Sequence, residues 1–579
     1  MLYQPNEAAY RTWLEDRCRQ LLTLQSLHPP IWNLLISVVI AAEGDWTDAD
    51  LAATLQSLRG QNWHNLEATV FAGARTGSGS VGVGASVGGS VGSGDGSFSH
   101  LRGLTVENGR GIGDLFRAGP AACGLRGDYV LVVPPGSVFE VAAFSALNRA
   151  VVETAGPGRP DLVLFDHEYT GQEYIGQENT GQEYIAGAAR GTYPVFLPGF
   201  DAELLAALDY IGPAVLIRAA LFDRLARTTP LTSVRDVVLA AAHAELPLHT
   251  ALHTGHVRDV LMRLPGLPMS AMPANSDPTA AAAKIAAKIA AVPKSASIAV
   301  IIPNRNKAEL LAQCIASMLP DPLVKELIIV DNASDRPDTR DLYEQLKRDH
   351  GATIVAANQP FNFSRMINLG VAAAQADMLL LLNNDIEFKK PGALAQACAA
   401  ALRSEVGIVG TKLLYPDYTI QHAGILLDYH PYEHLVRAMH IGRGAENTSA
   451  GYLGQYGQAR ALQAVTGAFM MLRRQVFDQV GGFDEVALPV EFNDIDFCLR
   501  VGAAGYKILC LPLDRVFHHE SASRGKADTI PVRQMRIAAQ ALMARRWLPQ
   551  FQSDPYNHPI ARLGETAEVQ FNFTGTFIG

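Results

Sequence analysis

The stretch Phe361–Glu387, FNFSRMINLGVAAAQADMLLLLNNDIE, constrains the fold of this chain more than any other. Its polar opening can cap a helix, its alanine-rich middle favours one, and the apolar run Met378–Leu382 is typical of a strand buried on both faces. Asn383, Asn384 and Asp385 follow that run immediately. An open α/β sheet binds ligands at the carboxyl ends of its strands, and Mg²⁺ takes one or two carboxylates there with phosphates and water. A polar turn that merely ends a core strand is the alternative interpretation.

Length and charge narrow the class of protein. A chain of 579 residues is too long for one ordinary core, so two or more domains are expected. With 48% hydrophobic and 18% charged residues the chain is globular rather than disordered, and a net charge of −9 argues against a nucleic-acid partner. The six cysteines form no CxxC pair and no secretory leader is evident, so we expect free thiols and a cytoplasmic location.

Two shifts in composition divide the chain. Residues 76–98 are dominated by glycine and serine, which cannot bury enough apolar surface to order themselves, so we expect a flexible loop. Residues 276–296 are rich in alanine with lysines at helical spacing, and they read as an interdomain linker. We therefore expect domains at 1–275 and 297–548, and a C-terminal tail at 549–579 to which the sequence assigns no role.

The first half alternates apolar strand-like segments with helical ones, which favours a doubly wound parallel sheet. Strands are predicted at 34–42, 66–72, 128–133 and 161–165, with a helix at 48–58. The strand at 128–133 takes the place that Met378–Leu382 takes in the second half. It ends in PPGS, however, where the second half offers NNDIE.

The second half repeats this order with polar residues at its strand ends. We predict strands at 297–302, 326–330 and 353–356, with a helix at 309–318. The first strand runs into Pro303, Asn304 and Asn306, and the second into Asp331 and Asn332. Asp331 could accept a hydrogen bond from a base imide or a ribose hydroxyl. Alternatively, Asp331 and Asn332 cap the next turn.

Six segments in the second half together resemble the family 2 glycosyltransferases of the GT-A fold. They follow one another over Ser297–Gly525 and read IIPNRNK, IIVDNASD, FNFS with LLLLNNDIE, TGAFMMLRRQVFDQVGGFDE, NDIDFCLR and FHHESASRG. The resemblance implies an inverting transfer from a nucleotide-diphosphate sugar with the help of a divalent metal, Mn²⁺ or Mg²⁺.

The resemblance also implies roles for single residues. Asp494 matches the general base, which must take the proton of a poorly nucleophilic acceptor hydroxyl. Asp385 and His518 match the metal ligands, although His519 is an equally placed neighbour and Asn383 stands where many members have an acid. The residues expected to bind the nucleotide sugar are Pro303, Asn304, Asn306, Asp331, Asn332, Asn362, Arg365 and Asn384, and those expected on the acceptor side are Gly467, Glu491 and Asn493. Asp496 is expected to begin a helix rather than to act in catalysis.

The first half resembles a second, degenerate copy of the same fold, without the nucleotide-reading acid and the metal motif. The fold class that we expect is therefore α/β, with two tandem GT-A-like, Rossmann-type domains of which the N-terminal one is degenerate.

The expected function is the transfer of a sugar from dTDP-rhamnose, or from a UDP-hexose, to a hydroxyl of a growing surface glycan. A lipid-linked acceptor would bring the protein to the inner face of the membrane without spanning it. Two other functions stay open on the sequence, a nucleotidyltransferase acting on sugar phosphates and a non-catalytic scaffold for glycan assembly.

Overall fold

The computed structural model describes residues 7–27, 34–43, 46–61, 63, 65–72, 101–108, 110–153, 159–172, 190–244, 252–265, 292–293, 296–319, 321–358, 360–430, 435–519, 530–558, 561–563 and 569–571. The chain forms two compact units, Leu2–Met272 and Pro273–Phe571, which we call the first and the second unit. The expected loop at 76–98, nearly all of the expected linker at 276–296 and residues 520–525 of the last motif lie outside the described residues.

The first unit alternates helices and strands, as the sequence predicts. Its helices are α1 (Glu7–Leu27), α2 (Asp48–Arg59), α4 (Ile112–Ala118), the 3₁₀ helix η1 (Ala121–Cys123), α5 (Ala143–Glu153), α6 (Ala202–Ala207), α7 (Ala219–Thr228) and α8 (Val234–His243). Its strands are β1 (Ile36–Ala42), β2 (Leu66–Ala72), β3 (Leu101–Asn108), β4 (Tyr129–Val133), β5 (Val138–Phe139), β6 (Leu162–Gln172), β7 (Arg190–Val195), β8 (Val215–Arg218) and β9 (Thr254–Pro265).

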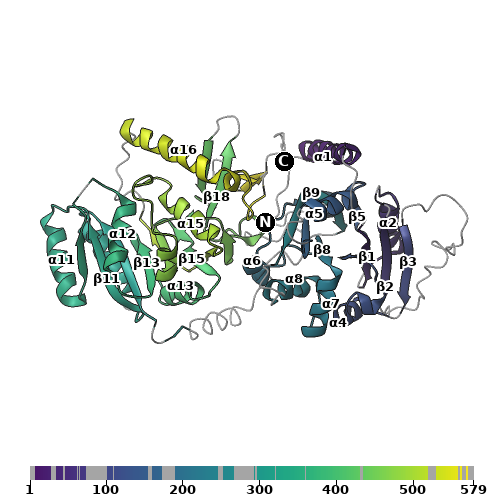
Figure 1. Cartoon of the computed structure of the whole chain (residues 1–579), viewed down its shortest axis with the longest axis horizontal. Coiled ribbons are helices and arrows are strands. Elements are labelled where there is room, and N and C mark those ends of the chain that lie inside the picture. The colour runs from purple at the N-terminus through teal and green to yellow at the C-terminus, as the bar shows by residue number, and fades with distance from the viewer. Residues whose placement is uncertain are drawn as a thin grey trace, which may run out of the picture. The chain divides into compact units, whose positions relative to one another are not determined.

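These strands form one sheet in the order β3-β2-β1-β4-β8-β6-β9-β5, with β7 paired to β6 (Figure 1). The pairs β3-β2, β2-β1, β1-β4 and β6-β9 are parallel. Strand β8 is antiparallel to both β4 and β6, and β5 is antiparallel to β9. The prediction of a parallel sheet is therefore wrong for this unit, since the sheet is mixed. Hydrophobic patterns locate strands but carry no direction, and direction here follows from the connections between them.

The second unit contains more strands. Its helices are α10 (Ala308–Met318), α11 (Pro337–His350), α12 (Phe363–Ala373), α13 (Ala393–Ala401), the 3₁₀ helix η4 (Tyr452–Gly454), α14 (Arg474–Gln479), α15 (Asn493–Ala503) and α16 (Ile530–Gln552). Its strands are β10 (Ile298–Asn304), β11 (Val324–Asp331), β12 (Thr353–Ala356), β13 (Met378–Leu382), β14 (Ile386–Phe388), β15 (Val406–Thr411), β16 (Leu413–Leu414), β17 (Ile420–His422), β18 (Ile425–His430), β19 (Leu435–His440), β20 (Arg460–Leu462), β21 (Phe469–Arg473), β22 (Lys507–Leu511), β23 (Val516–His518), β24 (Ala561–Leu563) and β25 (Val569–Phe571).

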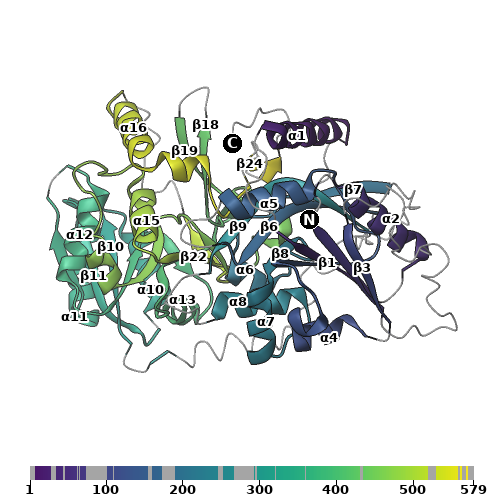
Figure 2. The same ribbon diagram turned by 45° about the vertical axis from the view of Figure 1, so that its right-hand side comes forward.

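The large sheet of the second unit has the order β12-β11-β10-β13-β21-β15-β22-β20. Beside it lie a four-stranded sheet, β14-β23-β16-β17, and the hairpin β18-β19. Helix α16 packs along this hairpin, as both views of the chain show (Figures 1 and 2). The chain thus has an α/β fold with large mixed sheets.

The two large sheets repeat one plan. In each, four parallel strands (β3-β2-β1-β4 and β12-β11-β10-β13) are followed by an antiparallel strand, β8 or β21, and then by a parallel pair, β6-β9 or β15-β22. The registers agree as well. Tyr129 pairs with Ile36 on one side and Arg218 on the other, as Met378 pairs with Ile298 and Arg473.

The smaller strands extend this correspondence. Strand β5 follows β4 and pairs antiparallel with the end of β9, as β14 follows β13 and pairs antiparallel with β23. Phe139 lies opposite Met262, and Phe388 lies opposite Val516. Counting along both registers, Gly136 occupies the position of Asp385, and Leu264 occupies that of His518.

Strand β13 is buried on both faces, as predicted. Met378, Leu380 and Leu382 belong to one hydrophobic core of the unit, and Leu379 and Leu381 to the other. Successive side chains of a strand point to opposite faces, and each buried leucine contributes about 1.5–3 kcal/mol. Polar residues therefore gather only where the strand ends. Among the described residues, none of the helices has the length and apolar character that crossing a membrane requires.

Candidate active site

Asp385 lies in the turn that joins β13 to β14, and it is buried. The neighbouring backbone is hydrogen-bonded to Cys314 of α10, whose thiol donates to Asn383 O at 3.6 Å. Burial raises the pKa of the Cys314 thiol, so this group stays protonated and can donate. The turn therefore presents the Asp385 carboxylate from a fixed backbone.

His518 faces Asp385 across a strand pair. Ile386 of β14 pairs with His518 of β23, and the two functional side chains meet with Asp385 Oδ1 at 3.2 Å from His518 Nε2. The other ring nitrogen, Nδ1, contacts Gln421 Oε1 at 2.7 Å. Sheet pairing thus brings together two residues that are far apart in the sequence.

His519 points elsewhere. Its Nε2 lies 3.1 Å from Glu387 Oε2, and its backbone N–H donates to Asp385 O at 3.0 Å. Burial alone would raise the pKa of Glu387, but hydrogen bonds from Lys389, Gln313 and His519 hold it below its ordinary value. Of the two adjacent histidines, His518 is therefore the one directed at Asp385.

The Asp385–His518 pair fits a divalent cation. Asp385 Oδ1 is buried and makes no hydrogen bond to a described residue. Two adjacent ligand atoms, each about 2.1 Å from an octahedral cation, lie about 3.0 Å from each other. This distance is close to the 3.2 Å between Asp385 Oδ1 and His518 Nε2. In the part of the chain that the structure describes, no three His, Cys, Asp or Glu side chains gather as a metal centre. The pair therefore suits a cation whose other ligands are substrate oxygens and water.

Asp494 lies in the first turn of α15 and lines the same cavity, of about 310 Å³, as Asp385 and His518. Gly467 N–H donates to Asp494 Oδ2 at 2.9 Å, and Ile495 N–H donates to Oδ1 at 2.9 Å. Phe492, just before the helix, has φ +58°, a left-handed conformation that is strained for a bulky residue. Strain of this kind is maintained at functional sites, and here it sets the start of α15.

The predicted acceptor-side residues border this cavity. Gly467, Glu491 and Asn493 all contribute to its lining. Asn493 Nδ2 also donates to Ser364 Oγ at 3.1 Å, which ties α15 to α12. A side chain at position 467 would bring its Cβ to 3.4 Å from Asp494 Cβ. The fold brings these three residues to one cavity.

A chain of hydrogen bonds links the polar strand ends. Asn384 Nδ2 donates to Asn304 Oδ1 at 2.6 Å, Asn304 Nδ2 donates to Tyr343 OH at 2.7 Å, and Tyr343 OH donates to Asp331 Oδ1 at 2.8 Å. Ser334 N–H donates to Asp331 Oδ2 at 3.1 Å. Asp331 therefore caps the turn after β11, which was the alternative interpretation, and the same contacts orient it.

Other residues that we expect to bind the nucleotide sugar also make hydrogen bonds with the backbone. Asn306 Oδ1 accepts from Asp335 N–H at 3.1 Å, and Asn332 N–H donates to Asn304 O at 2.9 Å. Asn362 is the N-cap of α12, because its Oδ1 accepts from Arg365 N–H at 2.9 Å and its Nδ2 donates to Glu485 O at 2.8 Å. Pro303 lies within β10 opposite Val330.

Sequence reasoning missed two polar residues of the cavity, Gln421 and His440. His440 Nδ1 lies 3.2 Å from Nδ1 of the fully buried His422, whose pKa burial holds well below its ordinary value. Gln421 and His440 come from β17 and β19, where no motif marks them. Only the folding of these strands against the cavity reveals them.

Residues 299–481 match the model of Glycosyl transferase family 2. The chain carries a family 2 glycosyltransferase domain. The resemblance seen in the sequence is thereby confirmed. Asp385 lies inside the matched region, whereas Asp494 and His518 lie beyond it.

Curated relatives are similar to parts of this chain. The uncharacterized protein y4gI of Sinorhizobium fredii is 36% identical over 266 residues, which cover 45% of this chain and 29% of that protein. The O-antigen biosynthesis protein RfbC of Myxococcus xanthus is 30% identical over 505 residues, covering 81% and 36%. An N-acetylglucosaminyl-diphospho-decaprenol L-rhamnosyltransferase of Mycobacterium tuberculosis is 27% identical over 158 residues, covering 26% and 49%. The chain spans about a third of the length of the first two relatives.

Solved structures of glycosyltransferases are similar at a lower level. The mannosyltransferase PcManGT of Pyrobaculum calidifontis, in complex with GDP-Man and Mn²⁺, is 16% identical with a TM-score of 0.29, covering 45% of this chain and 70% of that one. GalNAc-T7 with UDP, GalNAc and Mn²⁺ is 12% identical with a TM-score of 0.36, covering 44% and 50%.

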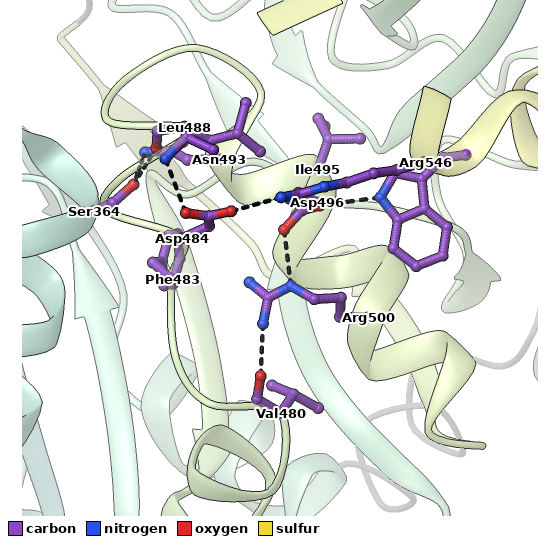
Figure 3. A network of polar contacts seen from close by, with 12 residues as sticks. Ser364, Val480, Phe483, Asp484, Leu488, Asn493, Ile495, Asp496, Arg500 and Arg546 are labelled. Atoms are coloured by element: carbon purple, nitrogen blue, oxygen red, sulfur yellow. Dashed lines mark hydrogen bonds and ion pairs between the residues drawn. The ribbon is translucent and has the colours of Figure 1, made fainter. Parts of the chain in front are cut away.

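In the glycosyltransferase unit, Asp496 anchors the helix that carries Asp494, through polar contacts that Figure 3 shows. Asp496 has no solvent exposure. Asp496 accepts from Arg500 Nε at 2.7 Å, Arg546 Nη1 at 3.1 Å and Trp547 Nε1 at 3.0 Å. Arg546 also donates to Asp484 at 2.8 Å. We call Asp484, Asp496, Arg500, Arg546 and Trp547 the carboxylate clamp. It joins α15, α16 and the loop before α15.

Proposed function

We propose that the second unit transfers a sugar from a nucleotide-diphosphate donor to a hydroxyl group, with inversion at the anomeric carbon. The observation that carries this proposal is the cavity whose lining includes Asp385, His518 and Asp494. A transfer of this kind needs a site for the diphosphate and, beside it, a carboxylate that accepts a proton. One cavity would hold both reactants.

Asp385 and His518 would bind Mn²⁺ or Mg²⁺. The bound cation would supply charge neutralisation at the leaving diphosphate. Asp385 contributes a buried carboxylate oxygen, and His518 a ring nitrogen held by Gln421. Because both side chains are nearly excluded from solvent, with exposures of 2% and 12%, their electrostatic interactions are weakly screened by water.

Asp494 would act as the general base. The hydrogen bonds from Gly467 and Ile495 hold its carboxylate in one orientation toward the cavity. As the new C–O bond forms, the acceptor hydroxyl would pass its proton to this carboxylate. Attack from the face opposite the leaving nucleotide inverts the anomeric carbon.

The strand ends would bind the nucleotide. Asn304, Asn384 and Asp331 belong to one hydrogen-bonded chain, so their positions are coupled. Pro303, Asn306, Asn332 and Arg365 complete the proposed contacts. Asn362 would contribute indirectly, by fixing the start of α12, because both of its amide atoms already bond the backbone.

For the donor we propose dTDP-rhamnose or a UDP-hexose, and for the acceptor a hydroxyl of a lipid-linked surface glycan. Two relatives support this choice by their names, one an O-antigen biosynthesis protein and one an L-rhamnosyltransferase. Polar side chains in the lining, among them Glu491 and His440, suit the hydroxyl groups of a sugar.

We also propose that the first unit is a non-catalytic copy of the second. The matching strand order and registers support a duplication. Gly136 and Leu264 stand at the positions of Asp385 and His518, and neither side chain can bind a cation. Arg235, the second residue of α8, matches Asp494, the second residue of α15, and its guanidinium donates to Leu205 O and Ala206 O.

The backbone donor at the strand end of the first unit is also engaged. Gly136 N–H donates to Thr54 Oγ1 at 2.9 Å and to Asp50 O at 3.0 Å, so this backbone donor is already used. A Cβ at Gly136 would meet Pro265 Cγ at 3.0 Å. The first unit would therefore serve a structural or acceptor-guiding purpose.

A transfer assay tests the proposed activity. The full-length protein is incubated with Mn²⁺, a lipid-linked glycan acceptor and, in turn, dTDP-rhamnose, UDP-glucose and UDP-galactose. We expect acceptor-dependent release of the nucleoside diphosphate from one donor, abolished by excess EDTA and by Asp385→Ala. Full activity in EDTA would remove the cation from the mechanism. Release of pyrophosphate from a nucleoside triphosphate and a sugar phosphate would instead indicate a nucleotidyltransferase.

A further inference from the structure

We infer that Gln421 is a positioning residue which fixes His518 in the tautomer whose Nε2 lone pair faces Asp385. Gln421 lies in β17 and is 1% exposed. The inference rests on the proposed cation site. It adds Gln421, which would not bind the cation itself, to the ligands Asp385 and His518.

The two contacts between Gln421 and His518 determine the direction of each hydrogen bond. Gln421 Nε2 donates to the backbone oxygen of His518 at 3.4 Å, so the amide oxygen Oε1 is the atom that faces Nδ1, at 2.7 Å. A carbonyl oxygen can only accept, which requires the proton of a neutral ring to sit on Nδ1. Nε2 then carries a lone pair. Asn383 Nδ2, a donor 3.3 Å from Nε2, is compatible with this assignment.

This tautomer leaves Asp385 Oδ1 open to a cation. The Nε2 lone pair and Asp385 Oδ1 are both acceptors at 3.2 Å, so they attract a positive ion between them. In the other tautomer, Nε2–H would donate to Asp385 and occupy the oxygen that a cation needs. Partners of this kind around a metal-binding histidine set its tautomer and ring orientation, and their loss costs about 10–100-fold in metal affinity.

Direct measurement of Mn²⁺ binding tests the inference without the reaction. Calorimetric titration of the full-length protein with Mn²⁺ alone would compare wild type, Gln421→Met, Gln421→Glu and Asp385→Ala. Methionine matches the length of glutamine but accepts only weakly, whereas glutamate keeps an oxygen at Nδ1. Gln463→Met is the matched control, because the Gln463 amide donates to Gln550 O at 3.0 Å.

We expect Gln421→Met to weaken Mn²⁺ binding by about 10–100-fold. Gln421→Glu and Gln463→Met should stay within about threefold of wild type or bind more tightly, because both keep the acceptor at Nδ1. Thermal unfolding of each variant shows whether it is folded at the titration temperature. Wild-type affinity in Gln421→Met, together with lost binding in Asp385→Ala, would overturn the role of Gln421 and leave the cation site intact. Equal binding in wild type and Asp385→Ala would overturn the proposed site itself.

Discussion

Asp494 and Asp496 stand two residues apart on α15 and have different surroundings. Asp494 is half-buried and lines the cavity, and among the described residues its carboxylate accepts from the backbone N–H groups of Gly467 and Ile495. Asp496 is fully buried beneath three charged or indole donors. Residue type alone does not separate the two carboxylates, but their partners do. These surroundings favour Asp494 over Asp496 as the proposed base.

Replacement of Asp494 by asparagine keeps the shape of the side chain and removes the base. We expect Asp494→Asn to lower the transfer rate by about 10²–10⁴-fold, the usual contribution of a positioned base. Donor affinity, measured by calorimetry with Mn²⁺, should be unchanged, because the base would contact the acceptor. Near-normal turnover in this variant would reject the assignment.

A buried histidine of the first unit predicts pH-dependent stability. Burial lowers the pKa of His167 to about 4 from the ordinary 6.5. Because the folded-state pKa lies below the unfolded one, the stability is complete above pH 6.5 and is lost as the pH falls toward 4. A shift of this size corresponds to roughly 3 kcal/mol over the window.

We therefore expect His167→Leu to flatten the dependence of the unfolding free energy on pH between 6.5 and 4. His243→Leu, which removes an exposed histidine of α8, is the control and should leave that dependence as it is in wild type. Urea unfolding at several pH values measures both. An unchanged pH slope in His167→Leu would contradict the role given to burial.

Several single residues could be predicted from the sequence, and others could not. Asp385, His518 and Asp494, which the sequence singles out by their motifs, line one cavity. The polar opening of residues 361–387 predicts the helix cap that Asn362 forms, but the bond from Asn362 to the distant Glu485 O could not be foreseen. Gln421 carries no local pattern, and its contact with His518 depends on the pairing of β17 with β16 and of β16 with β23.

At the level of elements, the carboxylate clamp connects the proposed base to α16. Arg546 donates to both Asp484 and Asp496, and these two hydrogen bonds raise the pKa of Arg546 above its ordinary value. Asp484 in turn accepts from Ala487 N–H at 2.9 Å, in the loop that leads to Glu491. The clamp therefore holds both the loop and the helix that line the cavity.

We expect Arg546→Met to lower kcat for transfer several-fold and to destabilise the protein by about 1–2 kcal/mol, because a bond to a buried carboxylate is lost. The cost stays modest because Arg546 is about a third exposed, at 35%, and water screens it. Arg545→Met, at the exposed neighbouring position, is the control. Equal kcat in the two variants, measured below their unfolding temperatures, would exclude a positioning role for the clamp.

The existence and bounds of many elements follow from the sequence. The predicted strands at 66–72, 353–356 and 378–382 are confirmed as β2, β12 and β13. Turn residues and apolar runs determine these positions locally. The direction of β8 could not be predicted, because apolar strands read alike in both directions. Strands β18 and β19, which bring Ile425, Ala438 and His440 to the cavity, were not foreseen either.

At the scale of the whole molecule, the two units follow one plan with different strand ends. In the second unit an aspartate and a histidine face each other, and in the first a glycine and a leucine hold the same register positions. The proposal assigns donor binding to the second unit alone. The two halves differ in sequence at these strand ends, so the sequence alone does not show which residues correspond. The correspondence follows from the strand registers of the folded sheets.

Calorimetric titration of the full-length protein with its donor and Mn²⁺ tests this account most directly. The proposal predicts one donor molecule per chain in wild type, and no saturable binding after Asp385→Ala. Two donor molecules per chain in wild type, or one that remains bound after Asp385→Ala, would contradict it.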